Sequence, residues 1–185
     1  GTTGKGIGPT YSDKAARIGL RVGDIQNNFE EKYEALKNRH LQILKDLNYT
    51  DFDITEEEKK WLEGVDYMKK FHLTDTEIEI NRYLSEGKKV LAEGAQGSLL
   101  DIDHGTYPFV SSSSTTSGGV CTGLGVAPNK LDHIFGIFKA YSTRVGSGPF
   151  PVELFDETGD TIRHIGNARQ DQNDQRAPII LLFDV

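Results

Sequence analysis

The sequence has 185 residues, of which 36% are hydrophobic, and this size and composition are those of one globular domain. It has no apolar run long enough for a membrane span and no secretory signal peptide, so we expect no membrane partner. The single cysteine, Cys121, cannot form an internal disulfide, which favours a reducing, cytoplasmic location. The first residue is glycine and not methionine, which predicts a processed, trimmed or partial chain.

The net charge of −7 is concentrated in one segment. Residues 27–86 carry 9 Lys and Arg against 15 Asp and Glu, a balance of −6, whereas the other 125 residues carry 12 against 13. A protein that binds duplex nucleic acid usually has a basic stripe, so we expect no nucleic-acid partner. A small anionic ligand suits the few cations near the start better; these are Lys5, Lys14, Arg17 and Arg21.

The first ten residues, GTTGKGIGPT, are rich in glycine and predict a loop or a flexible end. They do not form a Walker phosphate loop, because Gly6 follows Lys5 and no strand precedes them. Hydroxyls and nearby cations could still form a looser anion site; its candidates are Thr2, Thr3, Lys14 and Arg17. A short helix is expected over residues 11–21, with Ser12 as its N-cap and with Lys14 and Arg17 on one face.

Three further helices are predicted within residues 27–86, each from a capping-box pair: Asn28 with Glu31, Thr55 with Glu58, and Thr74 with Glu77. Apolar residues recur at helical spacing in each segment. They are Phe29, Tyr33, Leu36, Leu44 and Leu47 in the first, Trp61, Val65 and Met68 in the second, and Ile80, Tyr83 and Leu84 in the third. The last helix is expected to stop at Gly87. This acidic, amphipathic section is typical of an outer helical layer.

Two apolar runs, residues 88–93 and 133–141, predict buried strands that each lead into a glycine-rich loop. Residues 146–160 predict a turn-rich extension. Strands separated by helices indicate an α/β fold, in which ligands bind beyond the carboxyl ends of the strands. The loops after Glu93 and Tyr141 are therefore candidate binding loops.

Three polar clusters follow the first predicted strand. In the first, Gln96 lies between glycines, and its amide could bind a nucleobase edge, although capping of local backbone is the favoured interpretation. In the second, the group Asp101, Asp103 and His104 could bind a metal or act as acid and base, but hydrogen bonding that fixes a tight loop is favoured. In the third, the hydroxyls of 111–116 precede Gly118 and Gly119, where a helix start could hold phosphate.

Four long segments resemble the adenylosuccinate synthetase family, in that family's order and at its spacing. They are GTTGKGIGPTYSDKAARIGLRVGDI at 1–25, EGAQGSLLDIDHGTYPFV at 93–110, SGGVCTGLGVAP at 117–128 and KAYSTRVGSGPFPVELFDETG at 139–159. The resemblance covers residues 1–167, the central part of a single domain, with the helical segment 27–86 the most divergent. The tail, 168–185, does not resemble the family. The resemblance implies a P-loop-NTPase-like α/β fold with a mostly parallel sheet flanked by helices, here incomplete.

The family serves AMP biosynthesis: it joins IMP and L-aspartate to give adenylosuccinate, with GTP hydrolysis to GDP and phosphate and with Mg²⁺. The resemblance implies that GTP phosphorylates the 6-oxygen of IMP, and that the aspartate amine then displaces phosphate from 6-phosphoryl-IMP. Phosphorylation turns a poor leaving group into a good one.

Four IMP contacts carry over by resemblance. Thr3 and Ser111 match hydroxyl residues that contact the 5′-phosphate, with Ser111 in place of the family's usual threonine. Gln96 matches a glutamine beside the 6-position of the base. Arg17 matches an arginine that reaches the IMP of the neighbouring subunit, which implies a homodimer.

The family's catalytic aspartate, its acid histidine and its Mg²⁺ ligands belong to motifs that this sequence does not contain. We therefore expect an internal fragment with no catalytic or metal-ligating residue of its own, one that binds IMP at most. A non-catalytic IMP-binding module and a purely dimerising product are the alternatives.

Overall fold

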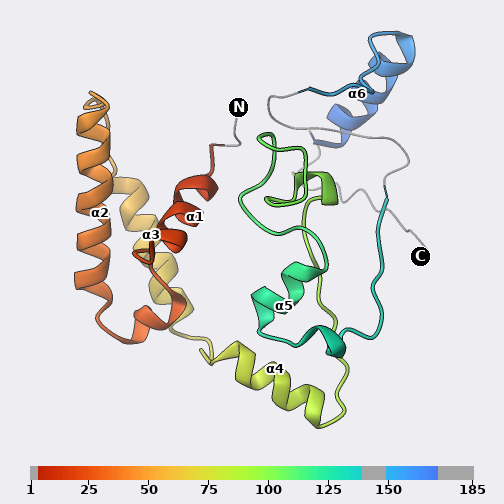
Figure 1. Cartoon of the computed structure of the whole chain (residues 1–185). Helices are drawn as coiled ribbons and strands as arrows, with labels where there is room; N and C mark the ends of the chain where they lie inside the picture. The colour runs from red at the N-terminus through yellow and green to blue at the C-terminus, as the bar shows by residue number, and fades with distance from the viewer. Residues whose placement is uncertain (1–3, 139–148, 171–185) are drawn as a thin grey trace. The chain divides into compact units, whose positions relative to one another are not determined.

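The computed structural model describes residues 4–138 and 149–170, in the element order α1 (Ile7–Ala16), η1 (Val22–Gln26), α2 (Phe29–Asp46), α3 (Thr55–Met68), α4 (Thr76–Ser85), η2 (Ser98–Leu100), α5 (Gly118–Leu124), η3 (Pro128–Lys130) and α6 (Glu157–Gln170) (Figure 1). The chain divides into two compact units, one of Gly6–Val126 and one of Gly1–Lys5 with Ala127–Val185. Among the described residues, no helix has the length and apolar character that crossing a membrane requires.

Helix α1 begins earlier than predicted. It starts at Ile7, after Gly6 in the left-handed conformation, and ends at Ala16. Ser12 is therefore not an N-cap; it lies inside the helix, where its hydroxyl donates to the carbonyl oxygen of Gly8 at 3.1 Å. Arg17 lies just beyond the helix end, so the predicted helical face shared by Lys14 and Arg17 does not form.

Helices α2 and α3 pack through aromatic rings. Phe29 and Tyr33 of α2 stack on Trp61 of α3, with ring centroids 5.8 Å and 5.0 Å from that of Trp61. Phe29 and Val65 are buried at 8% and 6% exposure, so the predicted apolar stripes do face one another. Stacked aromatic pairs of this kind contribute about 0.5–1.5 kcal/mol beyond the area they bury.

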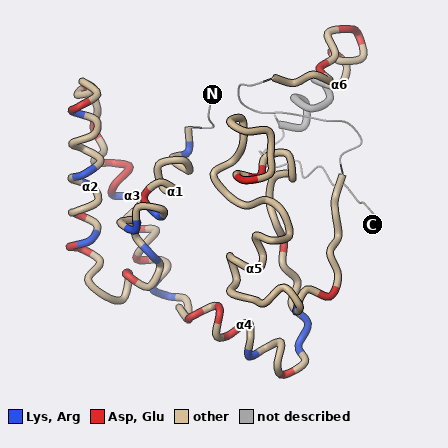
Figure 2. The backbone as a smooth tube through the Cα atoms, viewed as in Figure 1, with Lys and Arg blue, Asp and Glu red and all other residues tan. Residues whose placement is uncertain are grey.

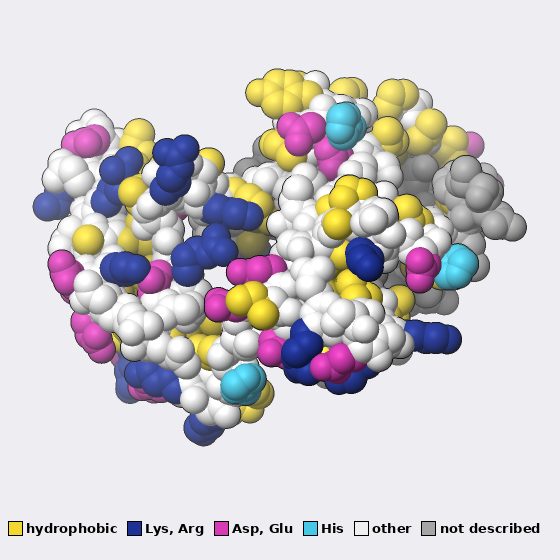
Figure 3. All heavy atoms as spheres, turned by 60° about the horizontal axis from the view of Figure 1, so that its bottom comes forward, with side chains coloured by type: hydrophobic (Ala, Val, Ile, Leu, Met, Phe, Trp, Pro, Cys, Tyr) yellow, Lys and Arg dark blue, Asp and Glu magenta, His cyan; other side chains and the backbone are white. Residues whose placement is uncertain are grey.

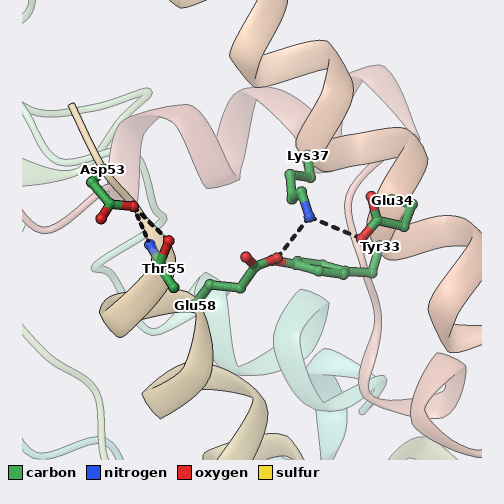
Figure 4. Close-up of polar contacts among 6 residues, drawn as sticks. All are labelled: Tyr33, Glu34, Lys37, Asp53, Thr55 and Glu58. Atoms are coloured by element: carbon green, nitrogen blue, oxygen red, sulfur yellow. Dashed lines mark hydrogen bonds and ion pairs between the residues drawn. The ribbon is translucent and has the colours of Figure 1, made fainter. Parts of the chain in front are cut away.

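A polar cluster beside the rings corrects the predicted capping box at the start of α3 (Figure 4). Glu58 does not accept a hydrogen bond from the backbone of Thr55, as a capping box requires. Its carboxylate instead accepts from the Tyr33 hydroxyl at 2.6 Å and from Lys37 at 2.8 Å. Burial, and then the carboxylate of Glu58, raise the pKa of Tyr33 to about 12. The start of α3 is capped instead by Asp53, which accepts from the backbone and the hydroxyl of Thr55. Asp53 thus caps α3 in place of Glu58, and Glu58 instead joins α3 to α2.

The other two capping boxes also differ from prediction. At the start of α2, Glu31 accepts from the side-chain amide of Asn28 at 2.7 Å rather than from its backbone. Helix α4 starts at Thr76 after Asp75, two residues beyond the predicted cap at Thr74. The existence of all three helices is nevertheless as predicted, because their apolar periodicity does not depend on the cap.

Left-handed residues follow α2, α4 and α5 in the first unit. Asn48 follows α2, Gly87 follows α4 as predicted, and Gly125 follows α5, each with φ between 56° and 74°. In the last case the next residue, Val126, donates back to the carbonyl oxygen of Cys121, as in a Schellman motif. Asn81 of α4 also donates to the carbonyl oxygen of Gly125 at 2.9 Å, which joins α4 to the end of α5.

The predicted buried strand at 88–93 is wrong. These residues form no ladder with any described segment, and Leu91 is 90% exposed. A strand needs a hydrogen-bonded neighbour, and the described residues provide none here. In the second run, residues 133–138 hold only an isolated bridge at Gly136, with Phe135 73% exposed, and 139–141 lie outside the described residues. The described residues are thus helix-rich and do not form the predicted sheet.

In the second unit, α6 begins at Glu157, inside the segment 146–160 for which turns were predicted. Asp156 caps it by accepting from the backbone N–H of Gly159 at 2.9 Å. The helix runs through residues 168–170, the first three of the segment in which no family resemblance was expected. A Cβ atom on Gly159 would lie 2.1 Å from the carbonyl oxygen of Leu154, so this turn requires glycine.

Charges of both signs alternate along the helices of the acidic segment (Figure 2). Many form pairs three or four residues apart on one helix, such as Lys60 with Glu57 and Arg82 with Glu86. Exposed pairs of this kind contribute little to stability, so they solvate the helices more than they hold them together. Hydrophobic side chains also lie open between the charges on the visible face (Figure 3).

Two glycines, Gly123 in α5 and Gly125 just after it, allow the packing of α4 against the end of α5 to be tested. A Cβ atom on Gly125 would lie 2.5 Å from Cβ of Glu77, and its φ of 65° strains any other residue. Gly125→Ala should therefore destabilise the first unit by at least about 1 kcal/mol. Gly123→Ala is the matched control, because nothing lies within 4 Å of its Cβ position, and it should stabilise by up to about 1 kcal/mol. Urea unfolding of both variants measures the difference; equal midpoints would contradict this packing.

Candidate functional site

The loop between α4 and α5 is organised around one buried carboxylate. Asp101 is only 1% exposed. Its Oδ1 accepts from the backbone N–H groups of Asp103 and His104, both at 3.0 Å, and its Oδ2 accepts from those of Thr115 at 2.7 Å and Thr116 at 3.3 Å. Four backbone donors from two separate segments therefore converge on a single side chain.

These donors keep Asp101 ionised. The N–H of His104 makes the largest contribution, and burial opposes it, with the result that the pKa of Asp101 falls from 3.8 to about 2. A carboxylate saturated with donors is a poor proton acceptor and a poor metal ligand. The favoured sequence interpretation, hydrogen bonding that fixes a tight loop, is therefore confirmed, and the acid–base alternative has no support at Asp101.

Further hydrogen bonds fasten the hydroxyl run, residues 111–116, to the segment before it. The backbone of Ser111 donates to the carbonyl oxygen of Leu100 at 2.7 Å, and the backbone of Ile102 donates to that of Ser113 at 3.2 Å. The Thr115 hydroxyl donates to the carbonyl oxygen of Gly97 at 2.7 Å. We call residues 96–116, held together by these bonds and by Asp101, the Asp101 loop.

Two of the predicted IMP contacts belong to the Asp101 loop. Gln96 is exposed at its start, next to the fastened Gly97, and has a left-handed φ of 62°. Ser111 is half-buried, and its hydroxyl lies 3.3 Å from that of Ser113. The loop thus holds an amide and a hydroxyl of the predicted site on one framework. Thr3, a third predicted contact, lies outside the described residues.

Arg17, the fourth predicted contact, stands exposed at the end of α1. Its φ of 64° is left-handed. The backbone N–H of Arg17 donates to the carbonyl oxygen of Lys14, and that of Ile18 donates to the carbonyl oxygen of Asp13. This is a Schellman motif with arginine where glycine or asparagine usually stands.

Arg17 and Gln96 share an unusual backbone conformation, because both have a left-handed φ. In the described part of the chain, the non-glycine residues with positive φ are these two and the asparagines Asn28 and Asn48. Asparagine adopts this conformation readily, whereas arginine and glutamine do so at a cost in free energy. Backbone strain of this kind concentrates at ligand-binding sites. The strain therefore supports the choice of Arg17 and Gln96 independently of the motifs that predicted them.

An open groove separates α1 from the Asp101 loop. Its lining residues are Gly8, Tyr11, Ser12, Lys14, Ala15, Ile102 and Ser112. The Ser112 hydroxyl lies 4.0 Å from the position that a Cβ atom on Gly8 would take, so α1 approaches the hydroxyl run closely. Lys14 lines the groove as one cation of the predicted anion site, but Arg17 and Gln96 do not line it.

Two other sequence hypotheses gain nothing from the geometry. Helix α5 does start at Gly118, as predicted, but the N–H groups of Gly119 and Val120 already donate to the carbonyl oxygens of Thr116 and Ser117. They are therefore not free for a phosphate. Cys121, the single cysteine, lies half-buried in α5. Within the described ranges, no three His, Cys, Asp or Glu side chains are grouped so as to hold a metal ion.

Comparison with known proteins identifies the relatives of this chain. The sequence model of the family described as adenylosuccinate synthetase matches residues 1–175. The adenylosuccinate synthetase of Bacteroides thetaiotaomicron is 65% identical over 167 residues, and that of Porphyromonas gingivalis is 61% identical over 166. Each alignment covers 90% of this chain and 39% of the relative, so the chain spans about two fifths of the length of the curated relatives it matches.

A solved structure gives the same result. The fully ligated adenylosuccinate synthetase of Plasmodium falciparum matches with a TM-score of 0.78 and 42% identity, over 90% of this chain and 39% of that one. This likeness is consistent with the predicted α/β class, although the described residues themselves are helix-rich.

The charge on Asp101 predicts a specific pH dependence of stability. Because the folded pKa of about 2 lies below the ordinary 3.8, the carboxylate stabilises the loop fully above about pH 4. This contribution should disappear as the pH falls from 4 through 2. Asp101→Asn should lower the urea midpoint at pH 7 and remove that part of the pH dependence. Asp103→Asn, at an exposed neighbour, is the control and should do neither. Identical curves for the two variants would show that the loop does not depend on Asp101.

Proposed function

The chain belongs to the adenylosuccinate synthetase family, and from this premise we propose that it serves purine nucleotide biosynthesis by the reaction of that family. The reaction joins IMP and L-aspartate to give adenylosuccinate, while GTP is hydrolysed to GDP and phosphate. The observation that carries this proposal is the Asp101 loop, because it holds Gln96 and Ser111 on one framework beside a fixed, saturated carboxylate.

The chemistry proceeds in two steps. GTP phosphorylates the 6-oxygen of IMP, and the amine of aspartate then displaces phosphate from 6-phosphoryl-IMP. An amide can donate and accept hydrogen bonds at once, so Gln96 suits the edge of a base whose 6-position changes during the reaction. The hydroxyls of Thr3 and Ser111 and the guanidinium of Arg17 suit the 5′-phosphate, with which arginine can form two parallel bonds.

We propose a homodimer as the working form, with Arg17 completing the IMP site of the neighbouring subunit. The exposed position of Arg17 beyond the end of α1 leaves its side chain free to extend outward. The finer fold, a P-loop-NTPase-like parallel sheet, and a cytoplasmic location also belong to the proposal, and the family resemblance supports them.

Mg²⁺, which the family uses, does not fit the residues described. No carboxylates there are grouped as ligands, and Asp101 already accepts four backbone hydrogen bonds. No family motif for the catalytic aspartate or the acid histidine occurs in these 185 residues either. We therefore assign them nucleotide binding, with no step through a metal. An IMP-binding module or a dimerising chain without chemistry is the alternative that this absence favours.

Arg17→Ala tests the phosphate contact. Loss of a hydrogen bond to a charged partner should weaken IMP binding by about 2 kcal/mol, which is roughly thirtyfold in Kd. Isothermal titration of the 185-residue chain with IMP measures this directly. Arg39→Ala, which removes the same charge from an exposed position on α2, is the matched control and should leave Kd unchanged. Equal affinity of the Arg17→Ala variant and the unaltered chain would exclude Arg17 from the site.

The absence of catalytic motifs predicts no turnover by this chain alone. With IMP, aspartate, GTP and Mg²⁺ present, a phosphate-release assay should give the rate of the protein-free control. Release that requires both IMP and the chain would contradict the assignment of these residues to binding alone.

A further inference from the structure

Helix α2 belongs to the acidic segment, to which neither the sequence nor the proposed function assigns a role. Its contacts with the segment around Arg17 provide one. The segment from Asp13 to Asp24, with Arg17 in its middle, is fastened to α2 near both ends. Asp13 Oδ2 lies 2.7 Å from Nε2 of His40, and Asp24 forms an ion pair with Lys32.

Asp13 joins the His40 contact directly to the turn. Its carbonyl oxygen accepts from the backbone N–H groups of Ile18 at 3.0 Å and Gly19 at 3.2 Å, the two residues that follow Arg17. Its carboxylate, 13% exposed, faces His40. Because a carboxylate only accepts, Nε2 of His40 carries the hydrogen of this bond. One residue therefore holds the turn with its backbone and α2 with its side chain.

Asp24 fastens the other end in a similar way. One carboxylate oxygen accepts from the backbone N–H of Arg21 at 2.7 Å, and the other pairs with Lys32. The Asp24 carboxylate is only 12% exposed, and its bonds to Lys32 and then to Arg21 lower its pKa. It thus caps η1 and ties it to the first turns of α2.

The turn between the two contacts is tight. A Cβ atom on Gly19 would lie 3.3 Å from the backbone nitrogen of Lys14, so Gly19 packs against the last turn of α1. Arg17 is held there at a φ of 64°, which arginine does not favour. A strained conformation persists only where its surroundings determine it, and the two contacts with α2 provide that support.

We propose that His40 and Lys32 of α2 are positioning residues that hold the turn presenting Arg17 to the 5′-phosphate of the nucleotide. The fastening of the turn stands on the contacts above. Its consequence for the nucleotide rests on the proposed function.

Hydrogen exchange tests the fastening without any ligand. In the 185-residue chain, His40→Ala should speed exchange of the Ile18 and Gly19 amides about tenfold by NMR, and His40→Ala with Lys32→Ala should speed it further. His40→Gln should restore most of the protection, because its Nε2 can donate to Asp13. Gln42→Ala, which removes a side-chain bond to Asp46 within α2, is the control. Unchanged exchange at Ile18 and Gly19 in the double variant would overturn the proposal.

Titration with IMP tests the consequence. His40→Ala should weaken binding about fivefold in the unaltered chain and should have no effect in the Arg17→Ala background. An equal loss in both backgrounds would overturn the positioning role, because His40 would then act independently of Arg17. If the unaltered chain does not bind IMP, the nucleotide role of Arg17 fails with the proposed function. Faster exchange at Ile18 and Gly19 would still establish that α2 holds the turn.

Discussion

The ionised carboxylate of Asp101 is the interaction on which the candidate site depends. A buried charge is costly unless it is fully hydrogen-bonded, and here four backbone N–H groups satisfy it. Those donors come from two segments more than ten residues apart, so the charge joins the turn at Asp103 and His104 to Thr115 and Thr116 at the end of the hydroxyl run. Gly105 completes the arrangement, since a Cβ atom there would lie 2.5 Å from two carbonyl oxygens. The side chain thus acts on function by shaping backbone rather than by touching a reactant.

The candidate site residues are held in place by hydrogen bonds and ion pairs of neighbouring residues. The Asp101 loop supports Gln96 and Ser111, and α2 supports Arg17 through contacts with Asp13 and Asp24. Both supports end at a residue whose backbone is strained, Arg17 in one case and Gln96 in the other. A strained backbone conformation persists only where surrounding hydrogen bonds offset its cost in free energy. Helix α2 of the acidic segment is thus fastened at Asp13 and Asp24 to both sides of the turn at Arg17.

The sequence predicted the helices well because their apolar periodicity is local, and it predicted the stop at Gly87 because a left-handed end favours glycine. It also predicted that Asp101 fixes a loop. The helix caps were less predictable, because a capping side chain can bond to residues of another helix. Glu58 accepts from Lys37 and Tyr33 of α2, and Asp53 accepts from Thr55 instead. The prediction of a strand at 88–93 failed because strand pairing depends on a neighbour that the segment itself does not specify. The strain at Arg17 was likewise hidden, since arginine gives no sequence signal for a left-handed turn.

We propose that a purine nucleoside monophosphate binds at Arg17, Gln96 and Ser111. NMR titration of the 185-residue chain with IMP, followed at each backbone amide, tests that claim most directly. The account predicts saturable shifts at Arg17, Gln96 and Ser111, with the amides of Gly64 in α3 and Gly123 in α5 unmoved. Shifts confined to the pocket between α2 and α3, which Tyr33, Glu58 and Leu62 line, would contradict it, and so would the absence of any saturable shift.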